Sequence, residues 1–175
     1  MLNRLALAGA SALLIAGVPL LADDGAHPTD AEIAHIAYTA GVLDVAAGKQ
    51  ALAKSHDKAV LDFAKEMVRD HSAVNDQALA LVKKLGVTPQ DNPTSQALSK
   101  DAAAKLKTYA ALNGAAFDKA YVANEVAYHK TVNGALANTL IPNAQNGELK
   151  ALLQTGLKLF TEHQMHAEHL AAGHH

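Results

Sequence analysis

Apolar residues recur every three or four positions over most of the chain, which is the spacing that lines one face of an α-helix. Four long stretches have this pattern and are predicted as helices at residues 29–55, 57–86, 115–138 and 147–172. A shorter and weaker stretch, from about residue 94 to 113, separates the second from the third. The pattern predicts an all-α protein, a four-helix bundle with an additional short helix between the second and third long helices.

Residue types that favour helix ends fit these boundaries. Residues 29–32 read Thr-Asp-Ala-Glu, a capping-box pattern at the start of the first helix, and Asp57 can cap the second. Gly86 is a typical stop at a helix C-terminus. The stretch 140–146 contains Pro142 and is expected to be the loop before the last helix.

Composition narrows the class of protein. The chain has 175 residues, enough for one domain with a substantial core, and only 4% are aromatic, which favours closely packed helices over a sheet. The net charge is −2, and no block of Lys and Arg alternates with aromatics, which argues against a nucleic-acid partner. Because cysteine is absent, disulfides, thiolate metal ligands and a cysteine nucleophile are excluded.

The N-terminus has the pattern of an export signal. Arg4 provides a positive charge, residues 5–21 form an apolar run, and Ala22 precedes a switch to polar residues. We expect residues 1–22 to be a signal peptide and 23–175 to be a single domain. The mature protein is then expected to be periplasmic or secreted and not attached to a membrane. An uncleaved anchor is the alternative, because Leu20 occupies a position where a small residue is preferred.

Acidic and histidine residues interrupt the apolar face of every long helix. Their positions follow the same spacing of three and four as their apolar neighbours, so they are expected to point inward: Asp44, His71, Glu125, His129 and His163. A buried carboxylate or imidazole without a partner costs several kcal/mol. Such residues are therefore expected to meet one another, water or a metal ion.

The heights of these residues along the bundle agree. Asp44 lies 12 residues before His56 and His71 lies 15 after it, so around a turn near His56 their heights differ by roughly 4.5 Å. The same counting from the loop before the last helix places Glu125 at nearly the same height along the bundle as His163. The predicted metal ligands are Asp44, His71, Glu125 and His163, with His129 or Asp118 as a further ligand.

Three segments resemble the bacterial exported family called domain of unknown function 4142, which is placed among ferritin-like bundles. They are residues 63–71, residues 114–121 with the following His129, and the late His163. The resemblance covers essentially all of the mature chain. It implies a ferritin-like four-helix core, a location outside the inner membrane and no established activity. The family's recurring polar positions fall on His71, Asp118, His129 and His163, and Asp44 stands where the family more often has Glu.

The histidines depart from the pattern of ferritin-like di-iron proteins, in which two helices carry Glu-x-x-His. Val68, Val126 and Phe160 stand three residues before His71, His129 and His163. A standard ferroxidase centre is therefore not expected.

Three functions remain open from the sequence. The first is binding of a transition metal (zinc, copper or iron) for buffering or stress protection. The second is a redox or oxygen-handling metalloenzyme at the same cluster, and the third is a metal-free envelope module whose protein partner is unknown. In the third case Asp44 accepts hydrogen bonds from Tyr121 or Tyr128, and Glu125 pairs with His129.

The C-terminus is rich in histidine. His166 and His169 follow His163 at intervals of three residues, and His174 and His175 end the chain. This set is expected either to bind zinc, copper or nickel loosely or to be a solvated, frayed end.

Overall fold

The computed structural model describes residues 27–173, and this part of the chain consists of helices joined by loops, without a strand. The four long helices are α1 (Asp30–Lys54), α2 (Lys58–Leu85), α4 (Gly114–Ala135) and α6 (Gly147–Gly173), and the additional helix is α3 (Pro93–Ala110). The prediction of an all-α protein is confirmed. The expected signal peptide at 1–22 and the terminal His174 and His175 lie outside the described residues.

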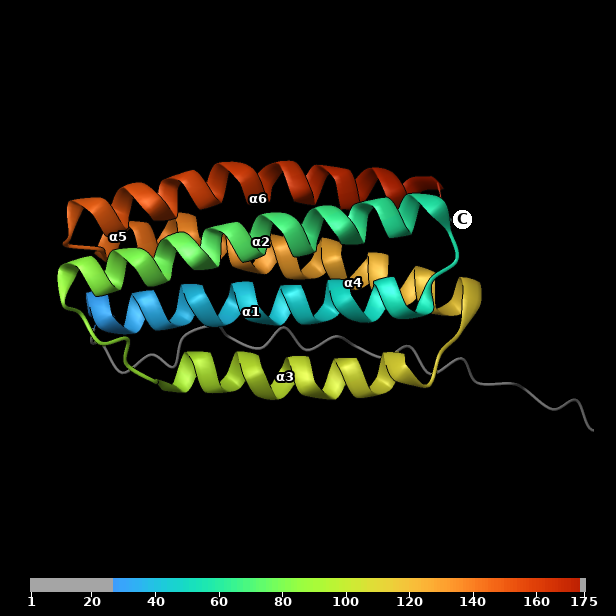
Figure 1. Ribbon diagram of the computed structural model, residues 1–175, viewed down its shortest axis with the longest axis horizontal. Coiled ribbons are helices and arrows are strands. Elements are labelled where there is room, and N and C mark those ends of the chain that lie inside the picture. The colour runs from blue at the N-terminus through green and yellow to red at the C-terminus, as the bar shows by residue number, and fades with distance from the viewer. Residues whose placement is uncertain (1–26, 174–175) are drawn as a thin grey trace, which may run out of the picture.

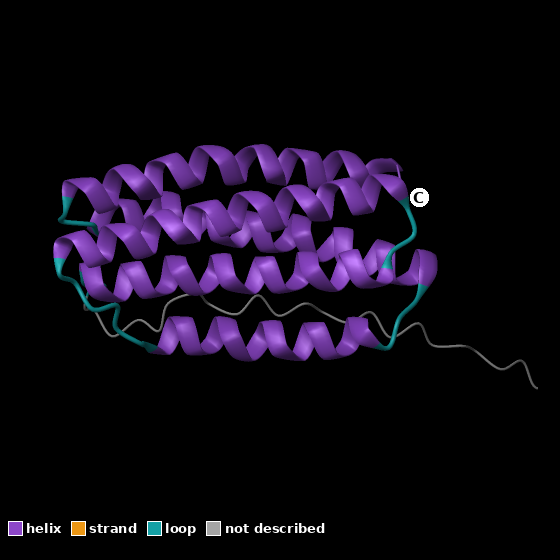
Figure 2. Cartoon of the chain, in the orientation of Figure 1, coloured by secondary structure: helices purple, strands orange, loops and turns teal. Residues whose placement is uncertain are grey.

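The long helices lie side by side, and α3 lies against α1 on the outside of the bundle (Figure 1). The most extensive packing is between α1 and α2 and between α4 and α6, which are antiparallel pairs. Helices α2 and α4 run in the same direction, so the chain must return along the bundle between them. Figure 2 shows that this return is made by α3 and its two loops.

The helix ends have the capping contacts that the sequence predicts. Thr29 Oγ1 accepts from the Glu32 amide at 3.3 Å, and Glu32 Oε2 accepts from the Thr29 amide at 2.9 Å. Asp57 accepts from the first amides of α2, and Gly86 ends that helix with a φ of 65°. Helix α3 begins earlier than expected, because Asn92 caps it.

The expected loop at 140–146 was wrong for most of its length. Helix α4 continues into a π-helical turn, η1 (Leu136–Leu140), and then into α5 (Ile141–Asn143), which contains Pro142. Proline cannot donate the usual helical hydrogen bond, and a wider π turn before it rearranges the backbone pairing at that point. The connection to α6 is therefore short, and Asp30 fixes it by accepting from the amides of Gln145 and Asn146, both at 2.8 Å.

The hydrophobic core is divided into two parts. One lies toward the α1–α2 turn and includes Phe63, Met67, Phe117 and Tyr121. The other lies toward α5. Its buried members are Ile33, Ala34, Ile36, Leu136, Leu140, Ala144, Leu149, Leu153 and Phe160. Buried polar residues occupy the level between the two parts.

Two glycines on α1 allow α2 to approach closely at that level. A Cβ atom on Gly41 would lie 2.1 Å from Asn75 Oδ1, and one on Gly48 would lie 2.9 Å from Val68 Cγ2 and 3.2 Å from the Ala64 carbonyl oxygen. Larger residues would push the helices apart. The two glycines flank Asp44, so the short aspartate side chain can reach across to α2.

None of the helices between residues 27 and 173 is both long and apolar enough to cross a membrane.

Candidate metal centre

Five of the six predicted ligands meet at the centre of the bundle, each no more than 3% exposed to solvent. They come from all four long helices: Asp44 from α1, His71 from α2, Glu125 and His129 from α4, and His163 from α6. The sixth, Asp118, is also buried but lies seven residues before Glu125 on α4, about 10 Å along the helix axis. Within residues 27–173, Asp118 belongs to no group of side chains that could share an ion.

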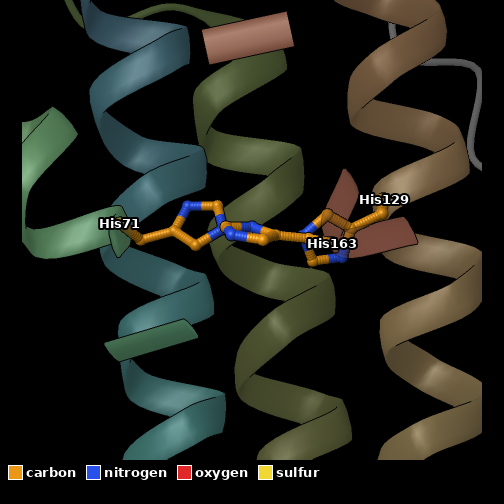
Figure 3. A group of neighbouring side chains, drawn as sticks. All are labelled: His71, His129 and His163. Atoms are coloured by element: carbon orange, nitrogen blue, oxygen red, sulfur yellow. The ribbon is translucent and has the colours of Figure 1, made fainter. Parts of the chain in front are cut away.

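Three imidazole rings form a nearly equilateral triangle. The ring centroids of His71, His129 and His163 are 5.3 to 5.6 Å apart, and a ligand nitrogen from each lies within 4.8 Å of the other two. Figure 3 shows the three side chains meeting between the helices. Phe160 stacks on His71 with centroids 4.4 Å apart and an interplanar angle of 11°, which fixes the orientation of that ring.

Two carboxylates extend this triangle. Asp44 Oδ2 lies 2.6 Å from His71 Nε2 and 3.9 Å from His129 Nε2. Although the first contact is short, it lacks hydrogen-bond geometry, and all three atoms are buried without a hydrogen-bond partner. Glu125 Oε2 is likewise unpartnered and lies 3.6 Å from His129 Nδ1. Buried polar atoms that lack hydrogen bonds cost about 1–3 kcal/mol each, and a cation shared by these atoms would offset that cost.

Hydrogen bonds on two rings leave one nitrogen of each free to act as a ligand. His129 Nδ1 donates to the Glu125 carbonyl at 3.0 Å, so Nε2 has the lone pair. His163 Nε2 donates to Asp70 Oδ2 at 3.1 Å, which leaves Nδ1 buried and unpartnered. Arg69 in turn holds Asp70 through two contacts of 2.6 and 2.9 Å. Histidines that bind metals in proteins are usually oriented in this way by a carbonyl or a carboxylate.

The two carboxyl groups of the centre have opposite pKa shifts. Burial on its own would raise the pKa of Asp44, but the close His71 imidazole outweighs it, with smaller contributions from His129 and the Glu125 carboxyl, so the pKa lies well below its usual range. Burial and the neighbouring Asp44 charge hold the pKa of Glu125 well above its usual range. At neutral pH the centre therefore has one firmly ionised carboxylate and a second that readily holds a proton.

The pKa of His129 is lowered from 6.5 to about 4, chiefly by burial and also by the nearby His71 and His163. The unfolded chain therefore binds a proton at His129 at a higher pH than the folded protein does. As the pH falls from 6.5 to 4, the free energy of unfolding of the metal-free protein should therefore fall. The contribution of His129 to this loss should be about 3 kcal/mol. Glu125, whose raised pKa acts in the opposite direction, should be replaced by Gln for this measurement.

Urea unfolding of the Glu125→Gln protein across this pH range measures the effect. The double variant Glu125→Gln with His129→Gln is the matched control and should have a smaller slope. Part of the slope remains in the control, because burial also lowers the pKa of His163. Equal slopes for the two proteins would show that His129 is protonated equally easily in the folded and unfolded states.

The donor set fits a transition metal. Imidazole nitrogen and carboxylate oxygen are ligands that suit zinc, iron and copper. The side chains form two overlapping groups whose ligand atoms lie within 4.8 Å of one another: His71, His129 and His163, and Asp44, Glu125 and His129. Met67, one helical turn before His71, packs in the core as a fully buried side chain and belongs to the hydrophobic cluster beyond the centre. Nitrogen and oxygen donors thus account for the centre without a sulfur ligand.

An apolar cavity of about 60 Å³ adjoins the centre on the α5 side. His71 and His129 form part of its wall, and apolar side chains from α1, α2, α4 and α6 form nearly all of the rest. A cavity of this size and character admits small apolar molecules more readily than ions.

Some residues around the centre were not predicted as functional. Arg69 and Asp70 directly precede His71 in sequence, yet they support His163 on the neighbouring helix α6. The metal-free interpretation of Asp44 does not match the contacts. Tyr128 donates to the Ala40 carbonyl at 2.8 Å instead of to Asp44, and the Tyr121 hydroxyl is buried without a partner.

Comparison with known families gives one match. The family model for a domain of unknown function, DUF4142, aligns with residues 18–170 and so covers most of the chain, including all five residues of the centre. The chain belongs to the DUF4142 family. Neither the curated proteins nor the solved structures gave a significant match. Membership of DUF4142 supplies no activity.

Proposed function

We propose that this protein binds one transition-metal ion between the four long helices and serves as a metal buffer or in stress protection. The ligands are His71 Nε2, His129 Nε2, His163 Nδ1 and Asp44 Oδ2. Glu125 supplies a further carboxylate beside His129. Zinc, copper and iron all suit these donors.

The observation that carries the proposal is the set of buried nitrogen and oxygen atoms that converge without hydrogen bonds. A metal-free polar network would be expected to satisfy its members, because buried polar groups in proteins are nearly always paired. Here the close polar contact of His71 and Asp44 is with each other, at 2.6 Å between Nε2 and Oδ2. The buried atoms around this contact have no hydrogen-bond partner: His71 Nδ1, Asp44 Oδ1, Glu125 Oε2, His129 Nε2 and His163 Nδ1. A single cation placed among them satisfies several of these atoms at once.

The topology supports a ferritin-like assignment. Antiparallel pairs joined by one long crossover between parallel helices are the ferritin-like version of the four-helix bundle, and ligands projecting inward from all four helices are typical of it. The ligand set, however, contains three imidazoles and two carboxylates. Di-iron centres have four carboxylates and two imidazoles, so one ion is the more economical interpretation of this centre.

Export is part of the proposal and rests on the sequence of residues 1–22. A buffer outside the cytoplasm fits a protein without cysteine, because no thiol is present that oxidation would inactivate. In this setting the bound ion is held in reserve rather than used for a reaction.

A second candidate function is oxygen or peroxide chemistry at the same centre. The apolar cavity favours it, because the cavity wall includes His71 and His129 and would bring a small apolar molecule such as dioxygen next to the ion. Turnover of peroxide by the iron-loaded or copper-loaded protein, measured against the metal-free protein, separates this candidate from a buffer.

The proposed function is tested by equilibrium binding to untagged protein that has never contacted a nickel column. Calorimetric titration with zinc should give one tight site per chain, and His71→Ala with His129→Ala should remove it. His56→Ala with His169→Ala is the matched control, since both side chains are exposed on the same helical bundle, and should bind as the wild type does. Wild-type protein that takes up no zinc, copper or iron would contradict the proposal.

A further inference from the structure

A second group of ligand-type side chains lies on the outer side of His163, between α2 and α6. Glu66 and Asp70 lie one turn apart on α2, and ligand atoms of these two residues and His163 lie within 4.8 Å of one another. His166, one turn further along α6, donates through Nδ1 to Glu66 Oε2 at 2.8 Å. Phe63 contacts the His166 ring edge to face, with centroids 5.0 Å apart. Glu66, Asp70 and His163 therefore form one group, which His166 adjoins through Glu66.

Exposure to solvent increases steadily across this group. The side chain of His163 is 1% exposed, that of Asp70 is 15%, that of Glu66 is 32% and that of His166 is 41%. The group thus extends from the buried centre to the surface of the bundle. Arg69 already pairs with both oxygens of Asp70, so within residues 27–173 Glu66 is the carboxylate of the group that lacks a Lys or Arg partner.

His163 belongs to both groups through its two ring nitrogens. Nε2 faces Asp70 in the outer group, while Nδ1 is buried and has no hydrogen-bond partner. A neutral imidazole has one N–H and one lone pair, so it ligates one ion at a time. With the proton on Nε2 it presents Nδ1 as a ligand, and with the proton on Nδ1 it presents Nε2 to the outer group.

We propose that Glu66, Asp70 and His166 form an entry site for a divalent transition-metal ion, and that His163 passes the ion from this site to the buried centre. This inference rests on the proposed function. The buried centre holds its ligands behind four packed helices, and an ion needs partners along its path because desolvated charge is costly in the interior. A partly exposed site sharing one ligand with the centre supplies those partners.

The kinetics of loading test this proposal. Cobalt(II), whose visible absorption changes with its ligands, is mixed with metal-free protein in a stopped-flow instrument. The double variant Glu66→Gln with His166→Gln should load cobalt about tenfold more slowly, or more slowly still, because it lacks the side chains that attract the ion to the entry site. The final absorption should match that of the wild type, because the buried ligands are intact. A loading rate equal to that of the control, Glu162→Gln with His169→Gln, would overturn the proposal.

A second measurement tests the entry site apart from the centre. The variant His71→Ala with His129→Ala lacks two buried ligands and should retain weaker binding of one cobalt ion, which adding Glu66→Gln and His166→Gln should remove. Cobalt binding to the wild type but not to this variant would overturn the entry site and leave the proposed function standing. Wild-type protein that binds no cobalt, zinc, copper or iron would overturn both.

Discussion

Replacing Asp44 by Ala should lower the free energy of unfolding of the metal-free protein by about 1–3 kcal/mol, the effect of leaving a buried polar group without its partner. Asp44 is 1% exposed and lies 2.6 Å from His71 Nε2, so its loss leaves the imidazole buried beside a space where the carboxylate was. Urea unfolding followed by circular dichroism measures the change. Asp76→Ala, at an exposed position of α2, should change stability by no more than about 0.5 kcal/mol.

The double variant Asp44→Leu with His71→Leu extends this test. Replacing both partners of a buried pair by apolar residues is often neutral or stabilising, so this protein should recover most of the stability that Asp44→Ala loses, while losing the metal. That outcome would show that the polar centre is retained for binding at the expense of stability. A double variant as unstable as Asp44→Ala would instead assign the pair a structural role.

Zinc at about one hundred times its dissociation constant should raise the free energy of unfolding of the wild type by about 2.7 kcal/mol. For a domain of this length, that corresponds to an increase of roughly 5–10 °C in the melting temperature. His129→Ala should abolish most of this increase, because His129 Nε2 is a buried donor without another partner. Thermal unfolding with and without zinc measures it.

Exposed histidines provide the control for this shift. His56→Ala should show the same zinc-induced increase as the wild type, because His56 lies in the α1–α2 turn and is exposed. If His129→Ala is stabilised by zinc as strongly as the wild type, the ion binds elsewhere, and the C-terminal histidines become the leading alternative.

The helices and their ends were largely predictable, because they depend on local chemistry. The capping box at Thr29 and Glu32, the cap at Asp57 and the stop at Gly86 all involve residues within one turn of the helix end. The segment around Pro142 was not predictable in the same way. Proline usually marks a break, and whether a π turn accommodates it depends on packing that local sequence does not specify.

The centre was partly predictable from periodicity and height. Counting residues from a helical hairpin placed Asp44 near His71, and the structure has these two side chains in contact. Helical periodicity assigns a residue to a face but gives no distance between helices. The close approach of α1 to α2 at Gly41 and Gly48, which brings the shorter aspartate within reach, therefore became evident only in three dimensions.

The supporting contacts were beyond sequence reasoning for a similar reason. Asp70 precedes His71 and so points about 100° away from it around α2, toward α6 rather than into the centre. Its partner, His163, is 93 positions later in the chain. Which nitrogen of each imidazole is free follows from such long-range hydrogen bonds, and no pattern within one helix encodes them.

X-ray absorption of the zinc-loaded protein reports the ligands of the bound ion and therefore tests the metal centre itself. We expect a single ion with three imidazole nitrogens at about 2.0–2.1 Å and carboxylate oxygen at about 2.0–2.2 Å, and one fewer imidazole in His163→Ala. A spectrum without multiple imidazole scattering, or one that is the same in His163→Ala as in the wild type, would contradict a metal centre between these four helices.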